Sequence, residues 1–84
     1  MNPPPRKPRD AALTSLRPGT TGVVTAIEGD RDSRQQLYSL GILEGTEIRL
    51  VRRAPMGGAL LVRVRGSQYA LGPDVASRIR IAPR

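Results

Sequence analysis

The sequence predicts a mainly β fold, a small barrel of about five strands with one short inserted helix. Two glycine-containing phrases near the centre of the chain carry much of this prediction. The first is LGILEGT at residues 40–46, in which Gly41 suits the left-handed position that ends a helix and Gly45 suits a turn before a strand. The second is APMGG at residues 54–58, which is typical of a hairpin loop.

Five strands are expected where β-branched or alternating apolar residues lie between turn signals. Strict alternation in the first strand places Val24 and Ile27 on opposite faces. In the third strand Leu60, Val62 and Val64 point inward. The expected strands are residues 21–27, 46–53, 59–65, 68–71 and 77–81. The residues expected to be buried are Leu37, Leu40, Ile48, Leu50, Leu60, Val62, Val64 and Ile79.

Short turns and one helix are expected between the strands. A helical turn at residues 13–16 precedes a Pro18-Gly19 turn, Gly66-Ser67 forms a two-residue hairpin turn, and Pro73-Asp74 begins a single helical turn. The inserted helix is expected over residues 33–40 and packs on the sheet through its leucines. Its N-cap is one of Asp30, Asp32 or Ser33. This arrangement is typical of a small open barrel of the SH3-like kind.

The size of the chain allows one small domain. It has 84 residues, and the expected division is a disordered tail rich in proline and arginine at residues 1–10 and a domain at residues 11–84. The absence of cysteine and histidine excludes disulfides, thiolate and imidazole metal sites, and Cys- or His-dependent catalysis. With no apolar run near the roughly 20 residues needed to span a bilayer, and no signal peptide, a cytoplasmic location is expected.

The net charge is +7, from 14 basic and 7 acidic residues. One interpretation is a negatively charged partner; the other is a solvated arginine-rich surface, because the arginines form no block. The two aromatic residues, Tyr38 and Tyr69, are too few for a base-stacking platform or an aromatic-lined groove for proline peptides. Nucleic acid is therefore a disfavoured partner.

Several phrases, taken in order, resemble the FeoA family of bacterial ferrous iron transport. They are the L-x-PG of residues 16–19, GVV at 22–24, RQQLYSLGILEGT at 34–46, RAPMGG at 53–58, YAL at 69–71 and ASRIRI at 76–81. The resemblance covers residues 13–81. It implies an SH3-like barrel that acts on FeoB, a membrane transporter of Fe(II) with a cytoplasmic G-protein domain. One departure is Glu44, where relatives often have proline.

The resemblance also implies a binding module and not an enzyme. No phosphate-binding G-x-x-x-x-G-K-S/T phrase is present, and no catalytic, cofactor-binding or metal-ligating residue is expected. Transition metal ion binding is a term used for the family, but the sequence offers no His ligands for Fe(II). Asp30 and Asp32 are expected to act in helix capping rather than in a cation site.

Contact with the transporter is expected through the loop at residues 54–58, the edge of the helix and nearby arginines. Met56 either projects from the loop tip or folds back over the barrel. The arginines are expected on one outer face of adjacent strands. The partner-binding candidates are Tyr38, Pro55, Met56, Arg49, Arg53, Arg63 and Arg65. The alternatives are a basic nucleic-acid-binding barrel of the SH3-like kind and an orphan relative of the C-terminal domain of iron-dependent repressors.

Overall fold

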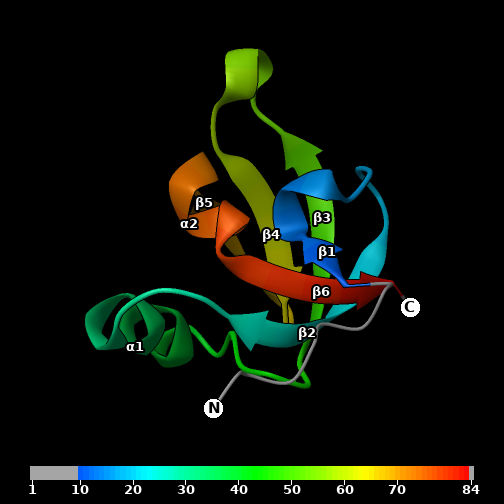
Figure 1. Ribbon diagram of the computed structural model, residues 1–84. Coiled ribbons are helices and arrows are strands. Elements are labelled where there is room, and N and C mark those ends of the chain that lie inside the picture. Colours follow the sequence, from blue (N-terminus) through cyan, green and yellow to red (C-terminus); the bar gives the residue numbers. More distant parts are fainter. Residues whose placement is uncertain (1–9, 84) are drawn as a thin grey trace.

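The computed structural model describes residues 10–83, so the expected N-terminal tail, apart from Asp10, lies outside the described residues. The described chain forms one six-stranded antiparallel sheet in the order β1-β6-β2-β3-β4-β5 (Figure 1). The strands are β1 Ala11–Ala12, β2 Thr21–Ile27, β3 Glu47–Arg53, β4 Leu60–Val64, β5 Ser67–Leu71 and β6 Ile79–Pro83. The helices are α1 Arg31–Ser39 and α2 Pro73–Ser77, with 3₁₀ turns η1 Leu13–Ser15 and η2 Pro55–Gly57.

The predicted mainly β fold with one inserted helix is confirmed. The strand that the sequence did not predict is β1, a two-residue segment that pairs with β6; two alanines carry no strand pattern. Figure 1 shows α1 beside one end of the sheet, while the loop between β3 and β4 projects from the opposite end. Within residues 10–83, none of the helices has the length and apolar character needed to cross a membrane.

The core consists of buried apolar side chains from the strands, from α1 and from the segments that connect them. Seven of the eight residues expected to be buried are buried, but Leu40 is 37% exposed. The reason lies in the end of α1, where the N–H groups of Gly41 and Ile42 donate to the carbonyls of Tyr38 and Leu37. This turn ends the helix and directs Ile42, which is 0% exposed, into the core in place of Leu40.

Two bulges alter the alternation of side chains. In β2 the pairing with β6 shifts between Val24 and Ala26, so Val24 and Ile27 are both buried although strict alternation separates them. In β3 the pairing with β4 shifts between Leu50 and Arg52. The second bulge decides which arginines share a face.

The β4–β5 turn lies one residue earlier than predicted. Arg65 and Gly66 both have positive φ, at 52° and 82°, and Val64 pairs with Ser67. These features are those of a two-residue type I′ hairpin turn centred on Arg65-Gly66. Arg65 therefore lies in the turn and not in the strand.

The start of α1 has the side-chain cap that its sequence indicates. Of the three candidates, Asp30 is the N-cap: its carboxylate accepts a hydrogen bond of 2.8 Å from the backbone N–H of Ser33. The hydrogen bonds from Ser33 hold the pKa of Asp30 below its usual value, and the charges of Arg78 and Arg34 act in the same direction. The cap fixes where α1 begins against the sheet.

Candidate functional site

The tip of the β3–β4 loop presents Met56 to solvent. Its relative exposure is 102%, so of the two expected orientations the projecting one is found. Met56 has φ 61°, a left-handed conformation that is uncommon for a residue other than glycine. The loop is closed below it by a hydrogen bond of 2.8 Å from the N–H of Ala54 to the carbonyl of Ala59. A flexible thioether side chain is thus held away from the barrel on a closed loop.

A row of arginines lies on the outer face of the sheet. Arg49 and Arg63 are paired residues of β3 and β4, so their side chains leave the same face. Beyond the bulge Arg52 pairs with Leu61, and this places Arg52 on the same face as Arg49. Strict alternation from Ile48 would place Arg52 on the inner face of β3. The bulge before Arg52 places it on the outer face instead. None of these three arginines has a salt bridge to a carboxylate among the interactions that the structure shows within residues 10–83.

Arg53 and Arg65 do not lie in this row, contrary to expectation. Arg53 pairs with buried Leu60, and its guanidinium donates to the backbone carbonyls of Thr14 and Leu16, the latter at 2.6 Å. This side chain ties η1 to the end of β3. Arg65 lies in the β4–β5 turn, at the end of β4 away from the projecting loop.

Tyr38 lies on α1, apart from the projecting loop. It is half-buried and packs against the core, and its hydroxyl donates a hydrogen bond of 3.4 Å to Oε2 of Glu44. The helix is at the opposite end of the sheet from the loop (Figure 1). The structure therefore brings Pro55, the neighbour of Met56, close to Arg52 at one end of the outer arginine row. It places Tyr38 elsewhere.

A hollow joins the loop to the arginine row. It has a volume of about 270 Å³, and its lining includes Arg52, Arg53, Pro55, Leu61 and Ala70, so Arg52 is the member of the row that lines it. We define the loop surface as Met56 together with Pro55, Leu61 and the outer arginines Arg49, Arg52 and Arg63. It combines apolar side chains with guanidinium groups that have no carboxylate partner in the described part of the chain, which suits an acidic protein surface with apolar residues at its centre.

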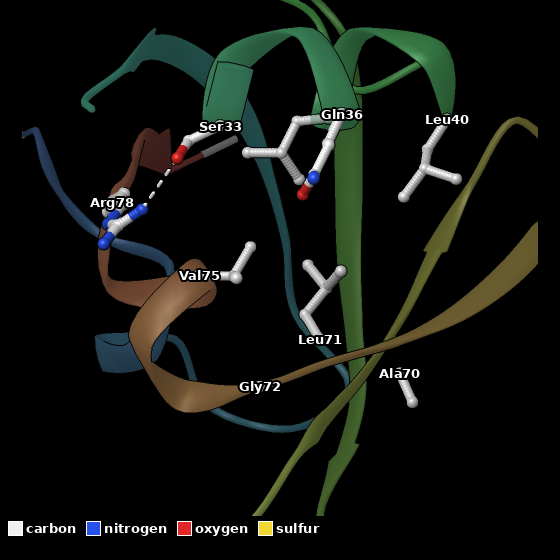
Figure 2. A pocket seen from close by; sticks show the side chains of 9 residues that line it. Ser33, Gln36, Leu40, Ala70, Leu71, Gly72, Val75 and Arg78 are labelled. Carbon is white, nitrogen blue, oxygen red and sulfur yellow. Dashed lines mark hydrogen bonds between the residues drawn. The ribbon is translucent and has the colours of Figure 1, made fainter. Parts of the chain in front are cut away.

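A second depression, which the sequence did not predict, lies between α1, β5 and α2 (Figure 2). We call it the helix groove; its volume is about 260 Å³. At one end Nη1 of Arg78 donates a hydrogen bond of 3.1 Å to Oγ of Ser33. Its apolar wall consists of Leu37, Leu40, Leu71 and Val75. The signal in the sequence is the apolar Leu40 at the end of the helix, which the sequence pattern predicts to be a core residue.

Metal-ligating side chains do not gather within the described residues: no group of three or more His, Cys, Asp or Glu residues is found among residues 10–83. Asp30 is used as a helix cap, and Asp32 is exposed in the first turn of α1. The described part of the chain therefore offers surfaces for binding and no cluster of side chains typical of a metal centre.

Comparison with known proteins decides the family. The model of the FeoA domain family matches residues 11–83. The chain belongs to the FeoA family. This membership links it to ferrous iron transport and confirms the resemblance in its ordered glycine phrases.

Solved FeoA structures have the same fold. An iron uptake regulatory protein, FeoA, is 31% identical to this chain, with a TM-score of 0.81 over 89% of this chain and 99% of that one. FeoA of Stenotrophomonas maltophilia, solved with zinc and described as a prokaryotic SH3 domain protein, is 30% identical, with a TM-score of 0.72 over 83% and 87% of the two chains. The predicted SH3-like fold is thereby confirmed. A search of curated protein sequences gives no significant match.

A regulatory protein also contains this fold. A manganese-dependent transcriptional repressor is 25% identical, with a TM-score of 0.84 over 94% of this FeoA-family chain but only 44% of the repressor. The likeness covers less than half of that protein. It accounts for the resemblance to a repressor domain and leaves the assignment to the FeoA family unchanged.

Proposed function

We propose that this FeoA-family chain is a non-enzymatic, cytoplasmic accessory module of bacterial ferrous iron uptake that binds the cytoplasmic region of a FeoB-type transporter. The observation that carries the proposal is the full exposure of Met56 beside an arginine-lined hollow. An exposed, flexible methionine suits contact with another protein. The lack of cysteine and histidine in the whole sequence supports a binding role over catalysis.

The loop surface contains two kinds of side chain that contribute to binding in different ways. Met56 and Leu61 supply apolar area, and removing this area from water on binding is favourable. Arg49, Arg52 and Arg63 supply long-range attraction and charge-assisted hydrogen bonds to carboxylates. The partner surface that fits this arrangement is acidic around an apolar centre. Of these arginines Arg52 lines the hollow, whereas Arg49 and Arg63 lie farther along the strands and Arg65 lies in the β4–β5 turn.

The test is a surface-binding assay between the full chain and the soluble cytoplasmic region of a FeoB-type transporter. Met56→Asp is expected to weaken binding by roughly tenfold or more, since it places an unpaired carboxylate in the apolar centre of the contact. Met56→Leu keeps an apolar side chain and is the matched control. Circular dichroism checks that both variants are folded. Equal affinities for the parent and a folded Met56→Asp variant would overturn the proposed contact.

The arginine row favours one second candidate, a nucleic-acid-binding barrel. Three guanidinium groups on one sheet face are also suited to phosphates. Titration of duplex and single-stranded DNA at physiological salt separates the two candidates. Binding to DNA that weakens steeply with salt, combined with no binding to the transporter region, would favour the nucleic-acid function.

A further inference from the structure

The outer edge of β5 is a free sheet edge. β5 is the last strand in the order of the sheet, and it pairs with β4 through Val64–Ser67, Val62–Tyr69 and Leu60–Leu71. Since the two-residue turn makes Val64 and Ser67 a hydrogen-bonded pair, the intervening residues Gln68 and Ala70 direct their backbone N–H and C=O groups away from β4.

Both of these residues are accessible. Gln68 and Ala70 are exposed, and within residues 10–83 no further hydrogen bond to their outward backbone groups is found. Such an edge is a template for another strand, because unpaired N–H and C=O groups two residues apart match the repeat of an extended chain.

The helix groove lies directly beside this edge. Leu71 of β5 and Leu40 after α1 line it together with Val75 of α2, and Figure 2 shows Leu40 and Val75 directed into the space between α1 and β5. Its volume is about 260 Å³, and an apolar cavity of about 150 Å³ is enough for benzene. A strand added to β5 would place every second side chain on this side, where the groove has room for a large apolar one.

The opposite side of such a strand is basic. Arg63 is the cross-strand partner of Gln68 on the outer face, and a strand beside β5 would lie about 10 Å from β4, two strand spacings away. An extended arginine side chain at position 63 is long enough to span much of that distance. Arg78 contributes a further guanidinium at one end of the groove. A second copy of this chain is a poor occupant, since each copy has a net charge of +7.

From these observations we infer that β5 receives an extended, acidic segment of the partner protein as an additional antiparallel or parallel strand, with alternate apolar side chains in the helix groove. The inference rests on the proposed function and names the manner of contact with the transporter's cytoplasmic region. Backbone hydrogen bonds at Gln68 and Ala70 supply the affinity, and the groove and Arg63 select the sequence. The hollow beside the projecting loop and the helix groove share Ala70 in their linings, so the two sites are adjacent.

Amide hydrogen exchange of the unmodified chain, alone and with the cytoplasmic region of a FeoB-type transporter, tests the inference. The amides of Gln68 and Ala70 are expected to exchange rapidly in the free chain and at least about tenfold more slowly in the complex, because binding pairs them. Ala70→Pro removes one outward N–H at an edge position that tolerates proline. It is expected to weaken the complex by roughly tenfold. Ala70→Ser keeps the N–H and is the matched control.

The outcomes separate the inference from the proposed function. A complex in which both amides exchange as in the free chain, and to which Ala70→Pro binds like Ala70→Ser, overturns strand addition and leaves the transporter as partner. Absence of any complex with the unmodified chain overturns both. Protection that rises with protein concentration without the transporter region, together with a doubled mass, would assign the edge to self-association instead. The exchange measurement uses no variant, so misfolding of Ala70→Pro does not remove the test.

Discussion

Arg49 and Arg63 face each other across β3 and β4 as a cross-strand pair. Like charges at directly opposed positions of a sheet are destabilising. Within residues 10–83 the structure shows no salt bridge between either guanidinium and a carboxylate. Retention of such a pair on an exposed face is consistent with a binding role, since functional surfaces often depart from what is best for stability.

Replacing one member of this pair is expected to change stability and binding in opposite directions. Arg63→Glu is expected to raise the free energy of unfolding by about 0.5–1 kcal/mol, because it creates an opposite-charge pair with Arg49. The same change is expected to slow association with the acidic partner, most clearly at low salt, where exposed charges are least screened. Denaturant unfolding and stopped-flow association measure the two effects. Arg31→Glu on α1 changes the net charge equally at another place; slowing of association to the same extent in that control would contradict a specific role of Arg63.

The way α1 ends predicts that truncating two leucines, three residues apart, will lower the free energy of unfolding by unequal amounts. Leu37 is 4% exposed and Leu40 is 37% exposed. Leu37→Ala is therefore expected to lower the free energy of unfolding by about 2–4 kcal/mol, through lost burial and a cavity. Leu40→Ala is expected to cost less than about 1 kcal/mol. Urea unfolding of both variants checks the difference, and similar costs for the two would show that Leu40 has a larger part in the core than its exposure indicates.

Local chemistry in the sequence was sufficient for much of this fold. A cap among Asp30, Asp32 and Ser33, Gly41 at the end of the helix, and the alternation of apolar residues in 60–64 each depend on neighbouring residues alone. The sequence therefore predicted the inserted helix and the main strands. Only their ends differ, by one or two residues in most cases.

The candidate site was less predictable because it depends on the relation between distant segments. The bulge after Leu50 moves Arg53 off the outer face and puts Arg52 on it, and no residue type marks that bulge in the sequence. The helix groove forms only when α1 packs near β5, more than 25 residues later in the chain. Met56 could be placed on a loop, but neither its full exposure nor its left-handed backbone follows from the residue types.

The cap at Asp30 predicts a pH dependence of stability. The pKa of Asp30 in the folded chain lies below its unfolded value of 3.8. Its contribution to stability is therefore fully present above that unfolded value and is lost as the pH falls through the folded pKa. Asp30→Asn keeps a capping side chain that does not titrate. Thermal unfolding between pH 2 and pH 6 is expected to show a smaller acid-dependent decrease in Tm for this variant; an identical decrease would contradict the role of the carboxylate.

The composition predicts weak metal binding. With no cysteine or histidine in the sequence, the isolated chain lacks the nitrogen and sulfur ligands that hold Fe(II) and Zn(II) tightly. Anaerobic calorimetry with each metal is expected to show no stoichiometric site of micromolar or better affinity. Asp30→Asn and Asp32→Asn are expected to leave any weak signal unchanged. A stoichiometric micromolar site in the parent chain would refute the prediction.

The backbone conformation at the loop tip predicts a second substitution that increases stability and weakens binding. Met56 occupies a left-handed conformation, with φ 61°, that asparagine adopts more readily. Met56→Asn is therefore expected to raise the free energy of unfolding slightly, by up to about 1 kcal/mol, while removing the apolar side chain proposed to contact the transporter. Guanidinium unfolding and the surface-binding assay measure the two quantities in one protein. Met56→Leu, which lacks the left-handed preference of asparagine, is expected to retain binding without the gain in stability. A Met56→Asn variant that is more stable and still binds like the parent would show that the strained tip serves something other than this contact.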